Sequence, residues 1–153
     1  MPADQPAPAA PRPDPVAEAR RVVETFLHLS MIPDPEAASA HLAPDLAMTF
    51  TGGRRMSGPA ESAAFNARRY GWVSKRFLAT DAALDPATGR VVVYNTGHLY
   101  GAWPDGTPFD GNRYVDRFEV RDGLITRMDV WNDSAEILLD RASLSETPLD
   151  TGG

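Results

Sequence analysis

The chain has 153 residues, of which 42% are hydrophobic and 24% are charged. Those proportions are typical of one soluble globular domain with a single sizeable core. Fifteen basic residues against 21 acidic ones give a formal net charge of -6, which argues against nucleic acid as a partner because phosphate binding needs clustered positive charge. The absence of cysteine excludes disulfides, thiolate nucleophiles and cysteine-bound metals.

Membrane and secreted proteins are disfavoured by the hydropathy pattern. No apolar run approaches the roughly 18–20 residues that a membrane helix requires, and the N-terminus lacks the basic-then-apolar order of a secretory signal. We therefore expect a soluble, cytoplasmic protein with no membrane partner. Lys75 is the only lysine among the 15 basic residues, and we attribute this to genomic base composition rather than to function.

The N-terminal third is predicted to be helical after an irregular start. Residues 1–15 hold six of the 14 prolines, which predicts a disordered lead-in that cannot bury enough apolar surface to order itself. An amphipathic helix is predicted over 16–31, where apolar side chains recur on one side. Pro33 ends that helix, and Asp34 is expected to cap a second short helix that runs to Leu42.

The pattern then changes from helix to strand. A short strand is predicted over 46–51, and a third helix over 57–70 with Ser57 as its N-cap. Asp133 and Glu136 have the spacing of a capping box and predict a terminal helix, followed by a flexible tail over 143–153. Between these helices lie four strands separated by turns rich in Asp, Pro and Gly, over 76–84, 90–103, 109–120 and 124–131.

Helices followed by a meander of long antiparallel strands indicate an α+β fold. We expect one domain over 16–142, in which a curved, mixed and largely antiparallel sheet wraps around the three N-terminal helices. Such a sheet forms a half-open cone with a central pocket between helices and sheet, where a small ligand would bind.

Four short strings follow one another along the chain: Phe26-Leu27, Leu42-Ala43-Pro44-Asp45, Ala63-Ala64-Phe65 and Asp122-Gly123-Leu124-Ile125. Their order and spacing over residues 16–142 resemble the SnoaL-like branch of the nuclear-transport-factor-2-like superfamily. The resemblance implies the cone fold. It does not by itself imply one activity, since this superfamily includes isomerases, dehydratases, cyclases, hydrolases and non-catalytic binding modules.

The chain is most similar in pattern to the phenazine-biosynthesis A/B and polyketide-cyclase-like branches. Ketosteroid isomerase is similar in the spacing of its first helices, but the positions of its functional residues look like Phe26, Phe50 and Tyr114 here. The helix-three histidine of the phenazine-biosynthesis proteins falls near Phe65. Neither specific mechanism is therefore implied for this chain.

The hairpin at Asp122-Gly123 leaves two registers open for the last strand. A regular two-residue turn places Asp116 opposite Asp129, and directly opposed like charges are unfavourable. A bulge near Thr126 places Asp116 opposite Val130 instead and brings charges of opposite sign together on the outer face. We favour the bulged register, which gives the strand a mostly apolar inner face.

Asp116 is the sharpest catalytic candidate. Tyr114, Asp116 and Phe118 share one face of their strand in either register, because alternation along a strand does not depend on its partner. Burial among apolar neighbours is expected to raise the pKa of Asp116 and suit it to proton transfer, unless the residue lies at the pocket mouth or pairs with a surface arginine. Tyr114 is either a hydrogen-bond donor to a substrate carbonyl or enolate, or a core aromatic residue.

Two further catalytic candidates lie outside that strand. If the turn at 104–106 is symmetric, His98 falls opposite Tyr114, where it could exchange protons near pH 7; a shift of one residue points it outward. By the resemblance, Asp133 matches the closing aspartate that some SnoaL-like cyclases use as acid or base, although the same residue is placed to cap the last helix.

The remaining pocket is predicted to be apolar and aromatic. His28, His41 and His98 lack the spacing of metal ligands, so we predict neither a metal nor another cofactor. Eight residues are expected to contact substrate: Phe26, Phe50, Phe65, Tyr70, Phe118, Met128, Val130 and Asn132.

Together the residues and the resemblance predict a cofactor-independent acid/base enzyme, an isomerase, dehydratase or cyclase. Its substrate would be a small, hydrophobic and cyclic metabolite that contains a carbonyl group. The alternatives are a non-catalytic ligand-binding or assembly module on the same fold, and an epoxide or lactone hydrolase with a water held by Asn132 or Asn112. Val115 and Trp131 on the convex face of the sheet predict a homodimer.

Overall fold

A computed structural model describes residues 6–32 and 34–144. Residues 1–5 of the predicted lead-in, Pro33 and residues 145–153 of the predicted tail lie outside the described residues. The helices are α1 (Pro15–Met31), α2 (Pro35–Ser39), α3 (Pro59–Arg69) and α4 (Ser134–Arg141), with a short 3-10 turn at Thr51–Gly53. The strands are β1 (Leu42–Phe50), β2 (Arg54–Met56), β3 (Trp72–Leu84), β4 (Val91–Ala102), β5 (Pro108–Arg121) and β6 (Leu124–Asn132).

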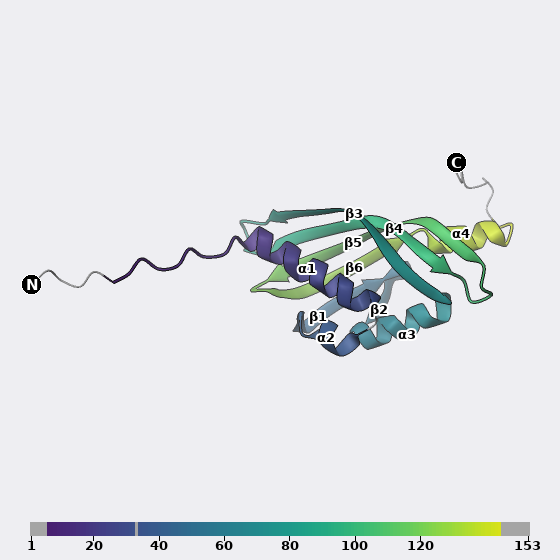
Figure 1. The fold of residues 1–153 in the computed structure, drawn as a ribbon, viewed down its shortest axis with the longest axis horizontal. Coiled ribbons are helices and arrows are strands. Elements are labelled where there is room, and N and C mark those ends of the chain that lie inside the picture. Colours follow the sequence, from purple (N-terminus) through teal and green to yellow (C-terminus); the bar gives the residue numbers. More distant parts are fainter. Residues whose placement is uncertain (1–5, 33, 145–153) are drawn as a thin grey trace, which may run out of the picture.

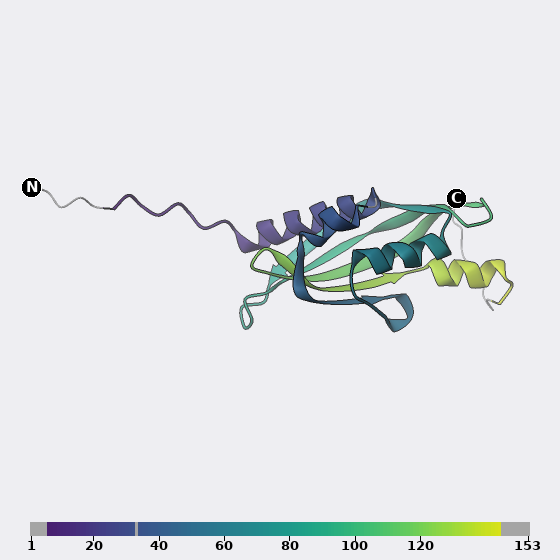
Figure 2. The same cartoon turned by 90° about the horizontal axis from the view of Figure 1, so that it is seen from below.

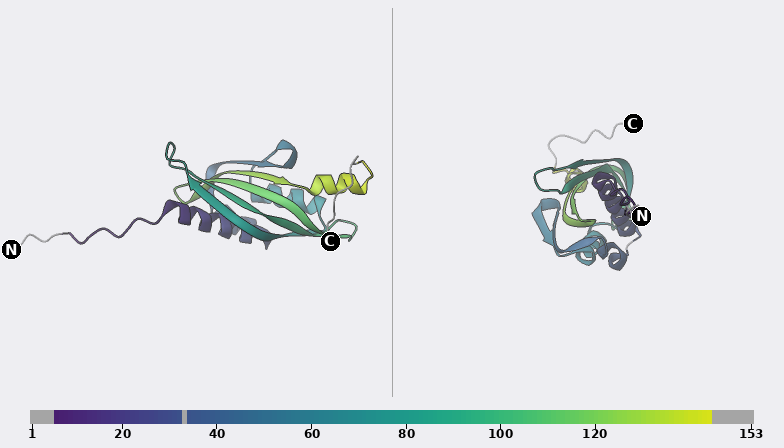
Figure 3. Two further views of the ribbon diagram at one scale, coloured as in Figure 1. Left: turned by 90° about the horizontal axis from the view of Figure 1, so that it is seen from above. Right: turned by 90° about the vertical axis from the view of Figure 1, so that its left-hand side faces the viewer.

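The six strands form one sheet in the order β2-β1-β6-β5-β4-β3, in which only the β1–β6 pair is parallel. Helices α1, α2 and α3 lie over one face of this sheet (Figures 1 and 2). The sheet curls around α1 and stays open (Figure 3). The predicted α+β cone is therefore confirmed. No helix among the described residues is long and apolar enough to cross a membrane.

Local sequence signals account for the helix starts. Asp14 accepts a hydrogen bond from the Val16 N–H at 3.1 Å and so caps α1, and Asp34 caps α2 through the Ala37 N–H at 3.0 Å. Ser57 does not cap α3, which begins after Gly58. The Ser57 hydroxyl donates to the Glu61 carboxylate at 2.8 Å instead.

Strand β2 was not predicted, and β1 begins four residues earlier than expected. The two strands form a hairpin whose turn holds Gly52 and Gly53 at φ 73° and 75°, a left-handed conformation that favours glycine. The glycine pair therefore reverses the chain rather than simply ending a strand.

The bulged register of the last hairpin is confirmed. Asp116 lies opposite Val130, Arg117 opposite Asp129, and Thr126 is the extra residue between two otherwise regular pairs. Arg117 and Asp129 also form an ion pair at 3.6 Å on the outer face. The bulge turns Met128 and Val130 toward the helices, which keeps the inner face of β6 apolar as expected.

The β4–β5 pairing does not follow the symmetric turn, and His98 takes the outward position that a shift of one residue gives. Ala102 pairs with Pro108 next to the turn. Further along the hairpin, a bulge places two residues of β5, Asp110 and Gly111, against the single residue Tyr100 of β4. Gly111 at φ 84° permits this bulge. As a result His98 lies opposite Arg113, not opposite Tyr114.

Because of this shift, Asp116 and Tyr114 of β5 have other neighbours on β4 than a symmetric turn would give them. Asn95 lies opposite Asp116, and Gly97 lies opposite Tyr114. A Cβ atom at Gly97 would come within 2.9 Å of the Tyr114 hydroxyl and 2.1 Å of the Arg76 carbonyl oxygen. The missing side chain at Gly97 thus leaves the space that the tyrosine ring occupies.

The outer face of the sheet carries exposed apolar or aromatic side chains on its three middle strands, β4, β5 and β6. Trp131 is 54% exposed, and its neighbour across the β5–β6 pair, Val115, is 37% exposed. Tyr94 on β4 is also exposed. We propose that two copies of the chain associate through this face, because large apolar side chains gathered on a sheet face are best covered by an apolar partner.

Replacing Trp131 with Glu should convert this dimer to a monomer, since it places a charge at the centre of the proposed contact. Light scattering after size exclusion measures the change. Ile32→Glu is the control, because Ile32 is also an exposed apolar residue, at 68%, but lies at the end of α1, away from the sheet face. Equal masses for wild type and Trp131→Glu would contradict the proposed interface.

Candidate functional site

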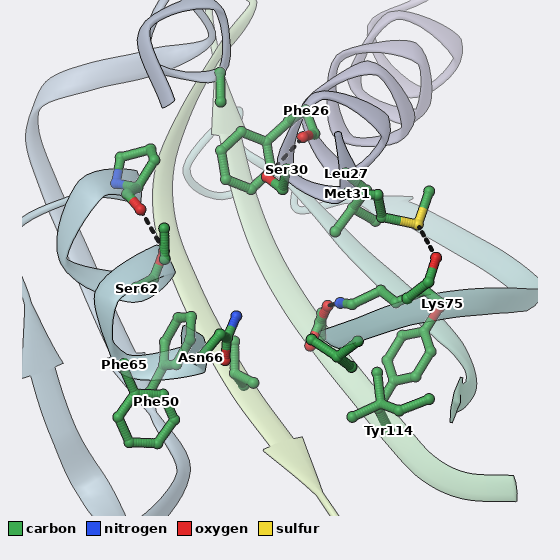
Figure 4. A pocket seen from close by; sticks show the side chains of 18 of the residues that line it. Phe26, Leu27, Ser30, Met31, Phe50, Ser62, Phe65, Asn66, Lys75 and Tyr114 are labelled. Carbon is green, nitrogen blue, oxygen red and sulfur yellow. Dashed lines mark hydrogen bonds and ion pairs between the residues drawn. The ribbon is translucent and has the colours of Figure 1, made fainter. Parts of the chain in front are cut away.

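A cavity of about 120 Å³ lies between the three N-terminal helices and the concave face of the sheet. One water needs roughly 10–15 Å³, so the cavity has room for part of an organic ligand. Lys75 reaches inward from β3, while Ser62, Phe65 and Asn66 project from α3 on the other side (Figure 4).

Most of the predicted substrate-binding residues line this cavity. Phe118 does not, because it is fully buried and packs edge-on against Phe26 with ring centroids 6.0 Å apart. It belongs to the core beneath the cavity, so its predicted contact with substrate is not supported by the geometry. The other seven line the cavity: Phe26, Phe50, Phe65, Tyr70, Met128, Val130 and Asn132.

Asp116 is the fully buried carboxylate that lines the cavity. Its inward direction follows from strand alternation on β5, where Tyr114 and Phe118 on the same face are also buried. The Asp116 side chain is 0% exposed, and its Oδ2 is in contact with the Nζ of Lys75 on β3. Oδ1 is buried and has no hydrogen-bond partner among the described residues.

Two opposing effects act on the ionisation of Asp116. Burial raises the pKa of this carboxyl group, because it disfavours the charged form, and the neighbouring Lys75 ammonium acts in the opposite direction. The burial effect is the larger one, so the pKa lies above its ordinary value. A carboxylate of raised pKa, with one oxygen unpartnered in a cavity, is suited to accept a proton from a bound molecule.

Lys75 was missed at the level of sequence, where it was attributed to genomic base composition. Its side chain is 19% exposed, and Nζ lies 4.3 Å from the centroid of the Tyr114 ring, in cation–π contact. The sequence feature that could have identified it is that Lys75 is the only lysine. The other 14 of the 15 basic residues are arginine, and the one lysine lies at an inward-facing strand position. Lysine offers a compact amine that can lose its proton, which arginine cannot do.

Tyr114 lies in the cavity wall, but its hydroxyl is already engaged. It donates a hydrogen bond to the Asn95 side-chain oxygen at 2.7 Å, and the Asn95 amide donates in turn to Thr80 at 3.0 Å. Burial, with the nearby Asp116 carboxylate, raises the pKa of Tyr114. The residue therefore presents its ring to the cavity, and the geometry does not support its predicted role as donor to a substrate oxygen.

The other two catalytic candidates lie outside the cavity. His98 is on the opposite face of β4, as its pairing with Arg113 requires. Asp133 forms an ion pair with Arg113 at 2.6 Å and makes no capping hydrogen bond to α4. Asn132 accepts the Ser134 N–H at 3.1 Å in its place. Of the four predicted catalytic residues, the structure brings only Asp116 and Tyr114 together.

A polar network closes the end of the cavity near α4. The Tyr70 hydroxyl lies 2.6 Å from the Ser134 hydroxyl, which also accepts a hydrogen bond from the Asn112 amide at 3.3 Å. Burial raises the pKa of Tyr70. Tyr70 is thus fixed at its hydroxyl end and contributes ring surface to the cavity. Within the described ranges, no group of three or more acidic or histidine side chains is arranged to hold a metal ion.

The fold and this cavity agree with the comparisons. The sequence pattern of the SnoaL-like domain matches residues 19–128, so the chain belongs to the SnoaL-like domain family. No protein among the curated ones compared matches its sequence significantly.

Solved structures show the same fold at low sequence identity. An NTF2-like protein of unknown function from Burkholderia pseudomallei is 18% identical, with a TM-score of 0.64 over 79% of this chain and 95% of its own. TerC, crystallised with polyporic acid, is 19% identical, with a TM-score of 0.61 over 79% and 95%. A protein from Jannaschia, proposed to be a SnoaL-like polyketide cyclase, is 17% identical, with a TM-score of 0.62 over 92% and 100%.

The raised pKa of Asp116 predicts a specific pH dependence of stability. The folded state holds this proton more tightly than the unfolded state, whose carboxyl group titrates near 3.8. The stabilisation is therefore complete below that value and is lost as the pH rises through the folded-state pKa. Urea unfolding from pH 3.5 upward should show the wild type losing stability relative to Asp116→Asn. A wild type that gains stability relative to the variant over that range would contradict a raised pKa.

Proposed function

We propose that the chain is a cofactor-independent acid/base enzyme that moves protons on a small, hydrophobic and cyclic carbonyl compound. Its family membership supports a cyclase- or isomerase-type activity in general. The observation that carries the specific proposal is the Asp116 carboxylate, buried in an apolar cavity with Oδ1 unpartnered among the described residues and Lys75 in contact with Oδ2.

The pair supplies the two functions that enolisation needs. Asp116 Oδ1 takes a proton from the carbon next to the carbonyl group, and the Lys75 ammonium donates a hydrogen bond to the carbonyl oxygen, where negative charge develops. Asp116 then returns the proton to a different carbon, or a carbon of the enolate attacks a second carbonyl group. The first outcome is an isomerisation and the second is a ring closure.

The lining of the cavity selects the rest of the molecule. Phe26, Phe50, Phe65 and Tyr70 offer aromatic surface, which suits a flat or cyclic apolar skeleton and keeps water from the reacting atoms. Asn66 on α3 also faces the cavity (Figure 4) and gives a second polar contact for a substrate that carries another oxygen. The fold neighbour TerC was crystallised with a small organic ligand, polyporic acid, which is consistent with such a cavity.

The proposal is tested by exchange of α-protons for deuterium. Cyclic enolisable ketones, with 2-tetralone as the first probe, are incubated with the protein in D₂O and followed by proton NMR. Replacing Asp116 with Asn should lower the exchange rate by at least about a hundredfold, because a positioned general base contributes roughly 10²–10⁴. Ligand-induced chemical shifts in the protein should persist, since the side chain keeps its size.

Asp133→Asn is the matched control, because it makes the same chemical change at a carboxylate outside the cavity. It should exchange protons at the wild-type rate. Equal rates for Asp116→Asn and wild type would refute Asp116 as the base. A wild type that binds these ketones without exchanging their protons would favour the alternative, a non-catalytic ligand-binding module.

A further inference from the structure

Lys75 carries the only side-chain amine in the sequence, and it lies inside the cavity rather than on the surface. Val73 and Leu99 line the cavity with it, and its Nζ lies over the Tyr114 ring. Its one polar partner among the described residues is the Asp116 carboxylate. The amine is therefore placed to meet a ligand that enters the cavity.

A proton acceptor in direct contact makes neutralisation of this amine possible without water. Asp116 is itself fully buried, and burial favours the protonated carboxyl group. Transfer of one proton from Nζ to Oδ2 therefore removes the buried charge of Asp116, and it leaves a neutral amine beside a neutral acid. An amine must be neutral to attack a carbonyl carbon, and lysines desolvated in apolar pockets are activated in this way.

We propose that Lys75 forms an imine with aldehydes or ketones that enter the cavity. The inference uses the cavity and the substrate class of the proposed function, and so rests on it for the carbonyl ligand. It adds a covalent step that α-proton transfer by Asp116 does not itself require.

Imine formation at Lys75 conserves atoms and charge. Nζ attacks the carbonyl carbon, the π electrons of the carbonyl group move to its oxygen, and that oxygen takes the proton held by Asp116. The resulting carbinolamine gives its second nitrogen-bound proton to the Asp116 carboxylate, and the same proton then passes to the hydroxyl group, which leaves as water. The net change is ammonium plus carbonyl compound to iminium plus water. The iminium carries the charge that the ammonium had and remains beside Asp116.

This step would strengthen the proposed chemistry. An iminium group withdraws electrons more strongly than a neutral carbonyl group, so the neighbouring C–H becomes more acidic. Asp116, now ionised beside the iminium, is in place to remove that proton. The same two side chains would then supply the electron sink and the base.

The test traps the imine by reduction, with benzaldehyde as the probe. Benzaldehyde has no α-proton, so its capture by Lys75 does not depend on whether Asp116 acts as a base. The folded protein is incubated at pH 7 with benzaldehyde and sodium cyanoborohydride, together with Nα-acetyl-lysine amide as an ordinary amine. Intact mass and peptide mapping then locate the benzyl groups on the chain.

We expect a benzyl group at Lys75, formed at least about tenfold faster than on the reference amine, because the cavity holds the aldehyde beside Nζ and the Asp116 carboxylate is in contact with Nζ to take its proton. Unfolding the protein in urea should abolish that advantage. Lys75→Arg keeps the positive charge beside Asp116 but should lose the adduct at position 75, leaving only reaction at the N-terminal amine.

Labelling confined to the N-terminus, or labelling of Lys75 no faster than the reference amine, would overturn the inference. These outcomes come from the wild-type protein, so they hold whether or not Lys75→Arg folds. They are also separate from the proton-exchange result. If benzaldehyde is not trapped but ketone protons still exchange, the imine is refuted and the proposed function stands. If the adduct is trapped but Asp116→Asn does not change the exchange rate, the imine stands and the role of Asp116 as the base is refuted.

Discussion

An ammonium and a carboxylate in contact inside an apolar cavity set the chemistry of this protein. Removing either charge from water is costly, and contact between Lys75 and Asp116 compensates part of that cost. The compensation is incomplete on the Asp116 side, where one oxygen is buried without a partner among the described residues. A bound carbonyl compound would complete the arrangement, since it brings an acceptor for the ammonium and a proton for the free oxygen.

Two β-bulges determine which side chains surround the Lys75–Asp116 pair. The bulge at Thr126 turns Met128 and Val130 inward, and keeps Asp129 with Arg117 on the outer face. The bulge at Gly111 places Asn95 and not a histidine beside the two inward residues of β5. Asn95 accepts a hydrogen bond from the Tyr114 hydroxyl and so fixes the position of the tyrosine ring. The Lys75 ammonium is in cation–π contact with that ring. Asn95 is thus engaged by Tyr114 and Thr80, and Asp116 Oδ1 keeps no hydrogen-bond partner among the described residues.

Local and pairwise rules were enough for the fold and for part of the site. Charge pairing predicted the bulged β5–β6 register, because like charges on facing positions are unfavourable. Alternation along β5 placed Asp116 on the same face as Tyr114 and Phe118. The β4–β5 register was not predictable in this way: it depends on a glycine bulge whose position the hairpin turn does not reveal, and His98 was misplaced as a result. Lys75 escaped prediction because the expected strand began at residue 76, whereas β3 begins at Trp72. In addition, β3 and β5 are both neighbours of β4 and not of each other, so no pairing rule connects Lys75 with Asp116.

Titration of the Asp116 carboxyl carbon by ¹³C NMR tests the central claim most directly. The protein is labelled at aspartate, and the Asp116 signal is assigned by its absence from the Asp116→Asn variant. We expect a pKa for Asp116 above the ordinary 3.8. The exposed Asp105 gives an internal contrast, because hydrogen bonds from Thr107 and Arg141 lower its pKa to about 2. A pKa for Asp116 at or below 3.8 would mean that its carboxylate is already fully satisfied by Lys75, and would contradict its role as a proton acceptor.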